Sequence, residues 1–172
     1  WIKPDTIGES NFARFIHKGT ATVGKQLQVN NNNIVNGLSF VINRGTTDAN
    51  AYSVANTFVL GTWQFVCGTY SEADGPRIYK NGTEVSYGSR TIGSGTTASD
   101  SGDALYIGNR GDAARTFDGL IDEVMIFNRV LTVSEILQIY NTGGSPAPGD
   151  TENPSAPGSL VASGGIGAIS LS

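Results

Sequence analysis

Short runs in which apolar and polar residues alternate recur along the chain, and most of them end at glycine, asparagine or aspartate. Residues 37–43 are typical, because Leu38, Phe40 and Ile42 occupy every second position. A period of two places these side chains on one face of a β-strand. Roughly nine or ten such runs, separated by turn residues, favour an antiparallel sandwich or barrel over alternating strands and helices.

The strongest hairpin signal is the dipeptide Asn81-Gly82, which separates the strand-like residues 77–80 and 83–87. A two-residue type I′ turn needs positive φ angles at both central residues, which asparagine and glycine adopt most readily. Two longer apolar runs, residues 63–70 and 119–127, predict two further strands, and we expect the second to be unbroken.

A single helix is expected after the last strand. Thr132 and Glu135 have the spacing of a capping box, in which each side chain bonds the backbone N–H of the other residue. Apolar residues then recur at helical spacing, and they are Val133, Ile136, Leu137 and Tyr140. The glycines at 143 and 144 predict the end of this helix.

The composition of the chain changes after residue 144. Residues 145–158 are rich in serine, proline and glycine, which is typical of an extended linker. Residues 159–172 contain enough apolar positions for two short strands. The pattern therefore predicts three parts: a main domain over residues 1–144, a linker over 145–158 and the start of a second module over 159–172.

The composition and charge of the chain argue against several classes of protein. Of 172 residues, 15% are charged and 23 are glycine, which argues against a helical protein, and the formal net charge is -4. An acidic chain offers no basic surface to a phosphate backbone, and no apolar run approaches the ~20 residues of a membrane span. We therefore expect no nucleic-acid partner and no membrane insertion.

The chemistry open to the chain is limited by its single cysteine, Cys67, and its single histidine, His17. One residue of each kind is too few to predict a zinc site, a disulfide framework or a Cys-His catalytic pair. Acidic side chains could instead hold a hard cation such as calcium.

Five motifs, taken in order, resemble the laminin-G-like (concanavalin A-like) jelly-roll domains of secreted and surface proteins. They are WIKPD (1–5), WQFVCGTY (63–70), IYKNG (78–82), LYIGN (105–109) and FDGLIDEVMIFNRVLTVSEI (117–136). The resemblance covers residues 1–142. It implies an all-β, two-sheet antiparallel jelly-roll sandwich with one short C-terminal helix lying against one edge.

The chain departs from the family pattern at both ends. In the family, one or two strands normally precede the segment that begins here at Trp1, so we expect the N-terminal strands of the jelly roll to be missing. Residues 150–172 resemble the opening strands of a fibronectin type III domain. The resemblance therefore implies a truncated second module after the linker.

Asp122 is the first candidate metal ligand. In an unbroken strand it would share one face with Leu120, Val124 and Ile126, and a carboxylate within an apolar stripe needs a partner. The resemblance implies a calcium ligand here, because this strand of concanavalin A-like folds often carries one on its aspartate. The alternative is a carboxylate that is hydrogen-bonded or paired with an arginine at a sheet edge.

Further acidic residues flank the predicted strand at 105–109. Asp100 and Asp103 lie in the loop before it and Asp112 in the loop after it, and loop acids at short spacing can hold calcium with oxygen ligands. No Asp-x-Asp-x-Asp-Gly loop is present, so a solvated turn is the alternative for this segment.

Candidate ligand contacts follow from the chemistry of sugar binding, in which aromatic rings stack on the sugar and polar side chains bond its hydroxyl groups. The candidates near loops are Tyr52, Tyr87, Phe117, Arg110 and Asp112. Trp1, Trp63 and Phe65 lie in well-patterned strands, where we expect them in the core. The tripeptide Arg110-Gly111-Asp112 matches an adhesion motif, but so short a match is expected by chance.

Catalysis is not expected from this chain. Jelly-roll glucanases carry alternating carboxylates in a Glu-x-Asp-x-x-Glu arrangement on one strand, and no such run is present. A chain rich in serine, threonine, glycine and asparagine, with almost no cysteine or methionine, is common outside bacterial cells. We therefore expect an extracellular or cell-surface location.

The sequence leaves three functions open. The first is a non-catalytic carbohydrate-binding or adhesion module, assisted by calcium, with a polysaccharide or cell-surface glycan as partner. The second is a structural or assembly module that joins neighbouring protein subunits by strand addition at an open sheet edge. The third, and the least favoured, is an accessory part of a polysaccharide hydrolase.

Overall fold

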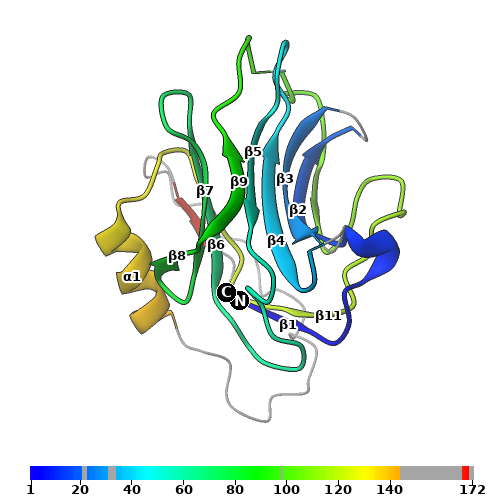
Figure 1. Cartoon of the computed structure of the whole chain (residues 1–172), viewed down its shortest axis with the longest axis vertical. Coiled ribbons are helices and arrows are strands. Elements are labelled where there is room, and N and C mark those ends of the chain that lie inside the picture. The colour runs from blue at the N-terminus through cyan, green and yellow to red at the C-terminus, as the bar shows by residue number, and fades with distance from the viewer. Residues whose placement is uncertain (21–22, 31–33, 98, 144–167, 171–172) are drawn as a thin grey trace.

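The chain folds into two layers of antiparallel strands with one helix at the side, which confirms the predicted fold class (Figure 1). The structure is a computed structural model, and it describes the chain except for residues 21–22, 31–33, 98, 144–167 and 171–172. None of the helices in these described residues is long and apolar enough to cross a membrane.

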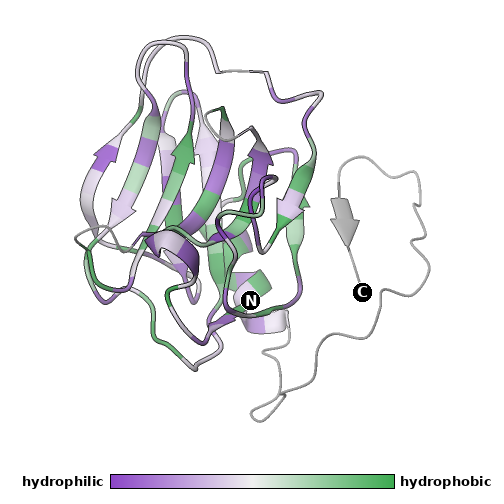
Figure 2. Cartoon of the chain, turned by 90° about the vertical axis from the view of Figure 1, so that its right-hand side faces the viewer, coloured by the Kyte–Doolittle hydropathy of each residue, from purple (hydrophilic) through white to green (hydrophobic). Residues whose placement is uncertain are grey.

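One layer is a six-stranded sheet. Its strands, in spatial order, are β10 (Leu105–Ile107), β2 (Arg14–Gly19), β3 (Gly24–Asn30), β4 (Gly37–Ile42), β5 (Ala49–Ser53) and β9 (Tyr87–Thr91). The register pairs Leu27 with Phe40 and Phe40 with Ala51, so apolar residues align across the sheet. Figure 2 shows the resulting alternation of hydrophobic and hydrophilic bands along the strands.

The second layer is built from shorter strands. The three-stranded sheet β6 (Val66–Ser71), β7 (Gly75–Lys80) and β8 (Thr83–Glu84) lies beside the pair β1 (Ile2–Pro4) and β11 (Gly119–Ile121). An isolated bridge between Ile2 and Gln64 connects the two sets. A 3-10 turn, η1 (Glu9–Asn11), leads from β1 into the six-stranded sheet.

The hydrophobic core between the layers consists of two clusters. The larger cluster is formed by Ile2, Ala13, Phe15, Leu27, Val29, Leu38, Ala51, Phe58, Ile78 and Phe117. The smaller cluster lies next to the helix and contains Trp1, Phe65, Tyr79, Leu131 and Ile136. Trp1 and Phe65 are buried and Trp63 packs against the smaller cluster, which confirms the expectation that these aromatic residues belong to the core.

The hairpin and the helix form as their local sequence signals predict. Asn81 and Gly82 have φ angles of 49° and 79°, as a type I′ turn requires. Helix α1 (Val133–Thr142) begins with a complete capping box between Thr132 and Glu135. A Cβ atom added to Gly82 would lie 2.8 Å from Leu137 of this helix, so the turn packs closely against α1 (Figure 1).

The expectation of one unbroken strand over residues 119–127 was wrong. The chain forms β11 and then, after a break, β12 (Met125–Phe127), and Glu123 in the break has a φ of 48°. The two strands have different partners: β11 pairs with β1, and β12 pairs with β13 (Ala168–Ser170). Asp122 therefore lies at a bend, where its backbone N–H donates to the carbonyl of Trp1.

A second difference concerns residues 83–87, which were expected to form one strand of the hairpin. Of these residues, only Thr83 and Glu84 (β8) pair with β7 as a strand. The chain then crosses to the other layer, where Ser53 of β5 pairs with Tyr87 of β9. Val85 and Tyr87 pack against the core during this crossing. Burial of these apolar side chains between the layers therefore competes with a longer hairpin.

The predicted linker at 145–158 lies outside the described residues, as does most of the predicted module at 159–172. The part that is described, β13, forms an antiparallel pair with β12, in which Ile169 lies opposite Ile126. The expected strand at residues 169–172 is therefore present in part, and it joins an edge of the same chain.

Candidate functional site

The outer side of the six-stranded sheet is almost entirely polar. The alternation that sends Leu27 and Val29 into the core sends Gln26, Gln28 and Asn30 to the opposite side. Strand pairing aligns these positions with polar residues of the neighbouring strands. This surface, called the polar face below, comprises Arg14, His17, Gln26, Gln28, Asn30, Ser39, Val41, Asn50, Tyr52, Ser89, Thr91 and Tyr106.

Two half-buried tyrosine rings lie toward opposite sides of the polar face. Tyr106 on β10 stacks on His17, with the ring centroids 6.3 Å apart and an angle of 25° between the planes. Tyr52 lies on β5, and burial, with a smaller effect of the Asp48 carboxylate, raises its pKa. Its phenol group is therefore protonated at neutral pH and can donate a hydrogen bond.

The polar face also concentrates polar atoms that have no partner. Eight buried side-chain nitrogen or oxygen atoms lack a hydrogen bond among the described residues. Five of them belong to this surface: Arg14 Nε, His17 Nδ1, Gln28 Oε1, Ser39 Oγ and Asn50 Oδ1. Because most buried polar atoms in proteins are hydrogen-bonded, these five atoms leave unused hydrogen-bonding capacity in the buried part of this face.

His17 is neutral in this environment. It is 1% exposed, and burial, together with the nearby Arg14 guanidinium, lowers its pKa. A neutral imidazole has one donor and one acceptor nitrogen. His17 is therefore an uncharged, buried ring that stacks with Tyr106.

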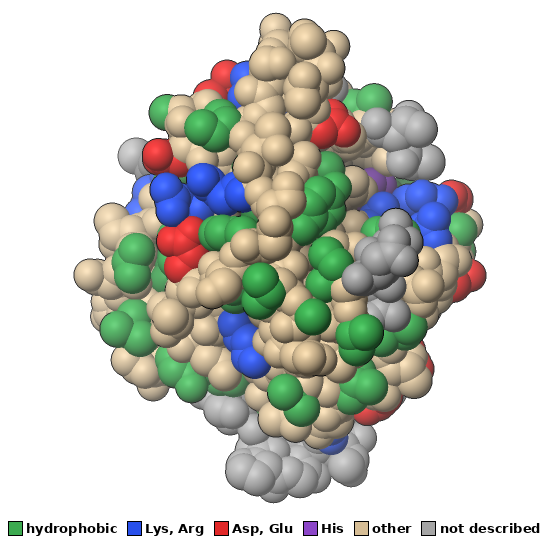
Figure 3. Space-filling model, in the orientation of Figure 1, with side chains coloured by type: hydrophobic (Ala, Val, Ile, Leu, Met, Phe, Trp, Pro, Cys, Tyr) green, Lys and Arg blue, Asp and Glu red, His purple; other side chains and the backbone are tan. Residues whose placement is uncertain are grey.

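The loop between β10 and β11 covers one end of the polar face. A Cβ atom added to Gly111 would lie 2.8 Å from the ring of Tyr106, so the loop backbone touches this ring. Arg110 Nε and Nη2 donate to Asp112 at 2.8 and 2.6 Å, and these hydrogen bonds lower the pKa of Asp112 to about 2. Figure 3 views this side and shows the single histidine beside a group of Lys or Arg side chains.

The structure places the five predicted ligand residues in different environments. Tyr52 belongs to the polar face, and Arg110 and Asp112 form an ion pair at its end. Phe117 is a core residue, with its ring edge-on to Phe15. The hydroxyl of Tyr87 accepts from the backbone N–H of Ile78 and donates to Glu84, and burial is the main cause that raises its pKa to about 12.

Most of the polar face, including Gln28, Asn50 and Tyr106, was not predicted from the sequence pattern. A usable signal was present in residues 26–30, where amide side chains occupy the three positions that alternate with Leu27 and Val29. Their alignment with Asn50 and Tyr106 depends on strand pairing, which the sequence pattern did not specify.

The structure brings two of the three predicted metal ligands together, because the backbone N–H of Asp103 donates to the carbonyl of Asp100 at 3.1 Å. Lys18 Nζ donates to the carbonyl oxygens of Asp100 and Asp103 at 2.9 and 2.8 Å, and Lys25 forms an ion pair with the Asp100 carboxylate. The carboxylate of Asp122 accepts a 2.8 Å bond from the backbone N–H of Glu123. No group of three or more possible metal ligands occurs among the described residues, and calcium binding stays a prediction.

An apolar cavity of about 520 Å³ lies between the two layers, on the opposite side of the six-stranded sheet from the polar face. Its walls include Phe40, Cys67 and Met125. Burial raises the pKa of the Cys67 thiol to about 11, so this cysteine is protonated at neutral pH. A protonated thiol is a poor nucleophile, and the cavity offers no reactive group there.

Comparison with known proteins shows the protein family to which the chain belongs. A laminin-G-type family profile, described as "Concanavalin A-like lectin/glucanases superfamily", matches residues 1–137. The chain therefore belongs to this superfamily. The matched region does not include residues 150–172, so the resemblance to fibronectin type III domains has no support.

One relative is the adhesion G-protein coupled receptor V1 of Danio rerio, which is 26% identical over 159 residues. The similarity covers 89% of this chain but only 2% of the receptor, so the chain corresponds to a small part of that protein. No solved structure matches the chain significantly.

Proposed function

We propose that this domain is a non-catalytic binding module for adhesion, and that it binds a carbohydrate on the polar face. The observation that carries the proposal is the composition of the polar face, where the partly exposed side chains of Gln26, Asn50, Tyr52 and Tyr106 lie together on one side of one sheet. The rings of Tyr52 and Tyr106 on the same face add surfaces on which a sugar ring can stack.

The chemistry of the polar face suits a ligand rich in hydroxyl groups. Gln26, Asn50 and Tyr52 are half-exposed and can both donate and accept hydrogen bonds. Sugar hydroxyls have the same double capacity, and tyrosine provides contact area at a low cost in conformational entropy. A polysaccharide or a cell-surface glycan is therefore the expected partner.

Membership of the superfamily and the relative's name support this proposal. The relative is an adhesion receptor, and concanavalin A-like domains include lectins by the description of the superfamily. An adhesion module acts at the cell surface or outside the cell, and we propose that location for this chain. The alternating carboxylates expected of a glucanase strand are absent from its sequence.

Binding to immobilised glycans tests the proposal. We expect the chain to bind at least one polysaccharide in affinity electrophoresis, and we expect Tyr52→Ala to weaken this binding about tenfold by removing an aromatic contact. Asn50→Ala should weaken it as well. Gln138→Ala and Asn128→Ala, which change exposed amides outside the polar face, are the matched controls.

Two results of this experiment test carbohydrate recognition and its assistance by calcium separately. Uniformly negative binding across glycans, with calcium present, would contradict carbohydrate recognition. Equal binding with calcium and with EDTA would contradict only the predicted assistance by calcium, for which Asp100, Asp103 and Asp122 are the candidate ligands.

A second candidate function is assembly by strand addition, and one observation favours it. Strand β13 pairs with the β12 edge, so this edge accepts an added strand. Exchange of such a strand between two copies would join them. If assembly is the function, the full chain should form oligomers in size-exclusion chromatography and a chain ending at Gly144 should not, whereas monomeric behaviour of both would contradict it.

A further inference from the structure

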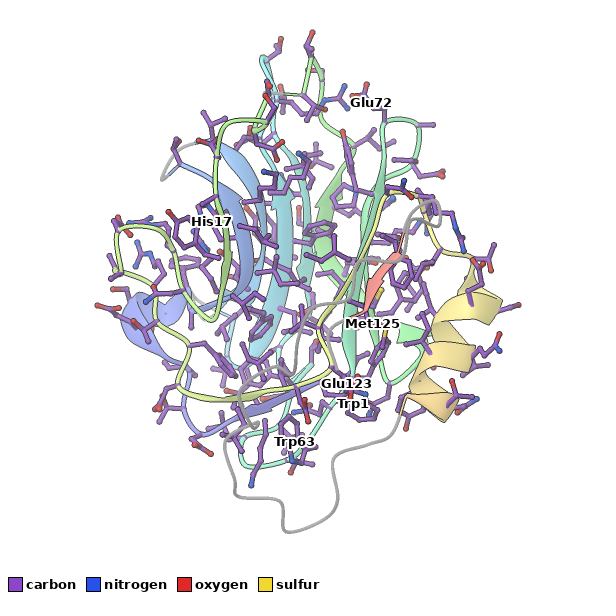
Figure 4. All side chains as sticks on the ribbon, turned by 180° about the vertical axis from the view of Figure 1, so that it is seen from behind. Trp1, His17, Trp63, Glu72, Glu123 and Met125 are labelled. Carbon is purple, nitrogen blue, oxygen red and sulfur yellow. The ribbon has the colours of Figure 1, made fainter. Side chains whose placement is uncertain are left out.

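Three arginines gather where the polar face meets the loop between β10 and β11. Arg14 lies at the start of β2, and Arg110 and Arg115 lie in the loop. The backbone N–H of Arg14 donates to the carbonyl of Arg115 at 3.0 Å, so these two residues are neighbours in space. Figure 4 shows His17 on the same strand, beside this loop.

The charges in this group are only partly balanced. Arg110 is neutralised by its ion pair with Asp112. Neither Arg14 nor Arg115 has a carboxylate oxygen within 4.0 Å anywhere in the described part of the chain. The carboxylate of Glu9, the other nearby acid, accepts bonds from Thr116. An excess of positive charge therefore remains at one end of the polar face, although the whole chain has a net charge of -4.

Arg14 is buried, which makes its missing counter-ion costly. The residue is 5% exposed and its Nε has no partner among the described residues. The hydrogen bond that its side chain makes there is a 3.4 Å contact from Nη1 to the carbonyl of Phe12. Burial, with repulsion from Arg110 and Arg115, lowers its pKa to about 10. A buried guanidinium without a paired anion is unfavourable, and an added anion would relieve this cost.

Arg115 is a second arginine whose guanidinium has no paired anion among the described residues. Its guanidinium lies over the ring of Phe12, 5.6 Å from the centroid, and this contact holds the side chain in place. Its Nε is buried and has no hydrogen-bond partner. Guanidinium groups bind carboxylate and sulfate oxygens with strong, directional hydrogen bonds, so two adjacent unpaired arginines favour an oxyanion as ligand.

We propose that Arg14 and Arg115, which lie beside the Arg110–Asp112 ion pair, bind a carboxylate or sulfate group of the polysaccharide on the polar face. The ligand is then an acidic polysaccharide, whose sugar rings contact the polar face while its charged groups contact the arginines. This inference rests on the proposed carbohydrate-binding function and specifies the class of ligand.

Matched pairs of polymers test the inference. The first pair is polygalacturonate and its methyl ester, which differ in the charge of the carboxyl group, and the second is dextran sulfate and dextran. We expect affinity electrophoresis of the full chain to show about tenfold tighter binding to the acidic member of at least one pair. The pair that shows the difference identifies carboxylate or sulfate as the charged group.

Variants separate specific recognition from general attraction to a polyanion. Arg115→Gln should lower affinity for the acidic polymer about tenfold and leave affinity for its neutral counterpart unchanged. Arg129→Gln is the control, because it removes the same charge at an exposed position on a different loop, next to helix α1. If Arg129→Gln has the same effect as Arg115→Gln, the arginine site is refuted.

A measurement on the unmodified chain keeps the inference testable even if the variant does not fold. Affinity for the acidic polymer should fall steeply as salt rises from about 50 to about 200 mM, and affinity for the neutral polymer should not. Equal affinities for both members of each pair would overturn the inference but leave carbohydrate binding intact. Failure to bind any polysaccharide would overturn both.

Discussion

In the strands of this domain, the side of the strand on which a side chain lies determines whether it is in the core or on the polar face. Leu27 enters the core, whereas its neighbours Gln26 and Gln28 reach the polar face. The same alternation places Tyr106 opposite His17 on the polar face, whereas its neighbours Leu105 and Ile107 lie on the other side of this edge strand and are exposed. Every second residue of the central strands therefore contributes its side chain to the candidate site.

The backbone of β1 lies very close to Gly119 of β11, which pairs with Pro4. Its φ is 144°, and an added Cβ atom would lie 2.2 Å from the carbonyl oxygen of Lys3. We expect Gly119→Ala to lower the free energy of unfolding by about 2 kcal/mol or more in urea denaturation, since the backbone of β1 must move.

Gly61→Ala is the matched control for this prediction. Gly61 also has a positive φ, of 68°, but an added Cβ atom meets nothing within 4 Å. It should lower the free energy of unfolding by only about 1 kcal/mol, the cost of the left-handed backbone. Equal effects of the two variants would show that the contact with Lys3 is unimportant.

At the scale of elements, the helix is the clearest case in which local sequence specifies structure. Thr132 Oγ1 accepts from the Glu135 N–H at 3.2 Å, and Glu135 accepts from the Thr132 N–H at 2.8 Å. Arg129 also pairs with Glu135, at 2.7 Å. All three residues lie within seven positions of one another, so this arrangement needs no long-range contact.

The Glu135 contacts predict a dependence of stability on pH. The hydrogen bond from Arg129 is the main cause that lowers the pKa of Glu135 from 4.5 to about 2. A lowered pKa in the folded state means that the carboxylate stabilises the fold above about pH 4.5 and loses this effect as pH falls toward 2.

Thermal unfolding of Glu135→Gln at several pH values checks this expectation. The variant should melt below the unmodified chain at pH 7, and the difference should shrink as pH falls from about 4.5 to about 2. Arg129→Gln should reduce the same pH dependence by removing its main cause. A melting difference that stays constant down to pH 2 would contradict the assigned role of Glu135.

The whole molecule depends on packing between its layers. Ile78 on β7 is fully buried in the larger cluster, together with Leu38 on β4 and Ala51 on β5. Its side chain therefore joins the second layer to the six-stranded sheet that carries the polar face. Loss of this contact should affect the stability of both layers at once.

Ile78→Ala tests this dependence. We expect it to lower the free energy of unfolding by about 2 to 5 kcal/mol, because it removes buried methyl groups and leaves a cavity. Val133→Ala, at a more exposed position of α1, should change it by less than about 1 kcal/mol. Similar losses for the two variants would contradict the role assigned to the packing of the layers.

The sequence by itself determined the features that depend on near neighbours. Alternation predicted the strands and the all-β class, Asn81-Gly82 predicted its turn, and Thr132 with Glu135 predicted the start of the helix. These signals work because backbone angles, capping bonds and side-chain alternation act over a few residues.

Only the tertiary structure decided the break between β11 and β12, the crossing of Tyr87 into β9 and the composition of the polar face. The break accompanies a change of partner strand, and the crossing buries apolar residues between the layers. The polar face joins His17, Gln28 and Asn50 from three strands. The physical reason is that strand pairing and packing bring together residues far apart in the chain, and alternation specifies the sides of a strand but not its neighbours.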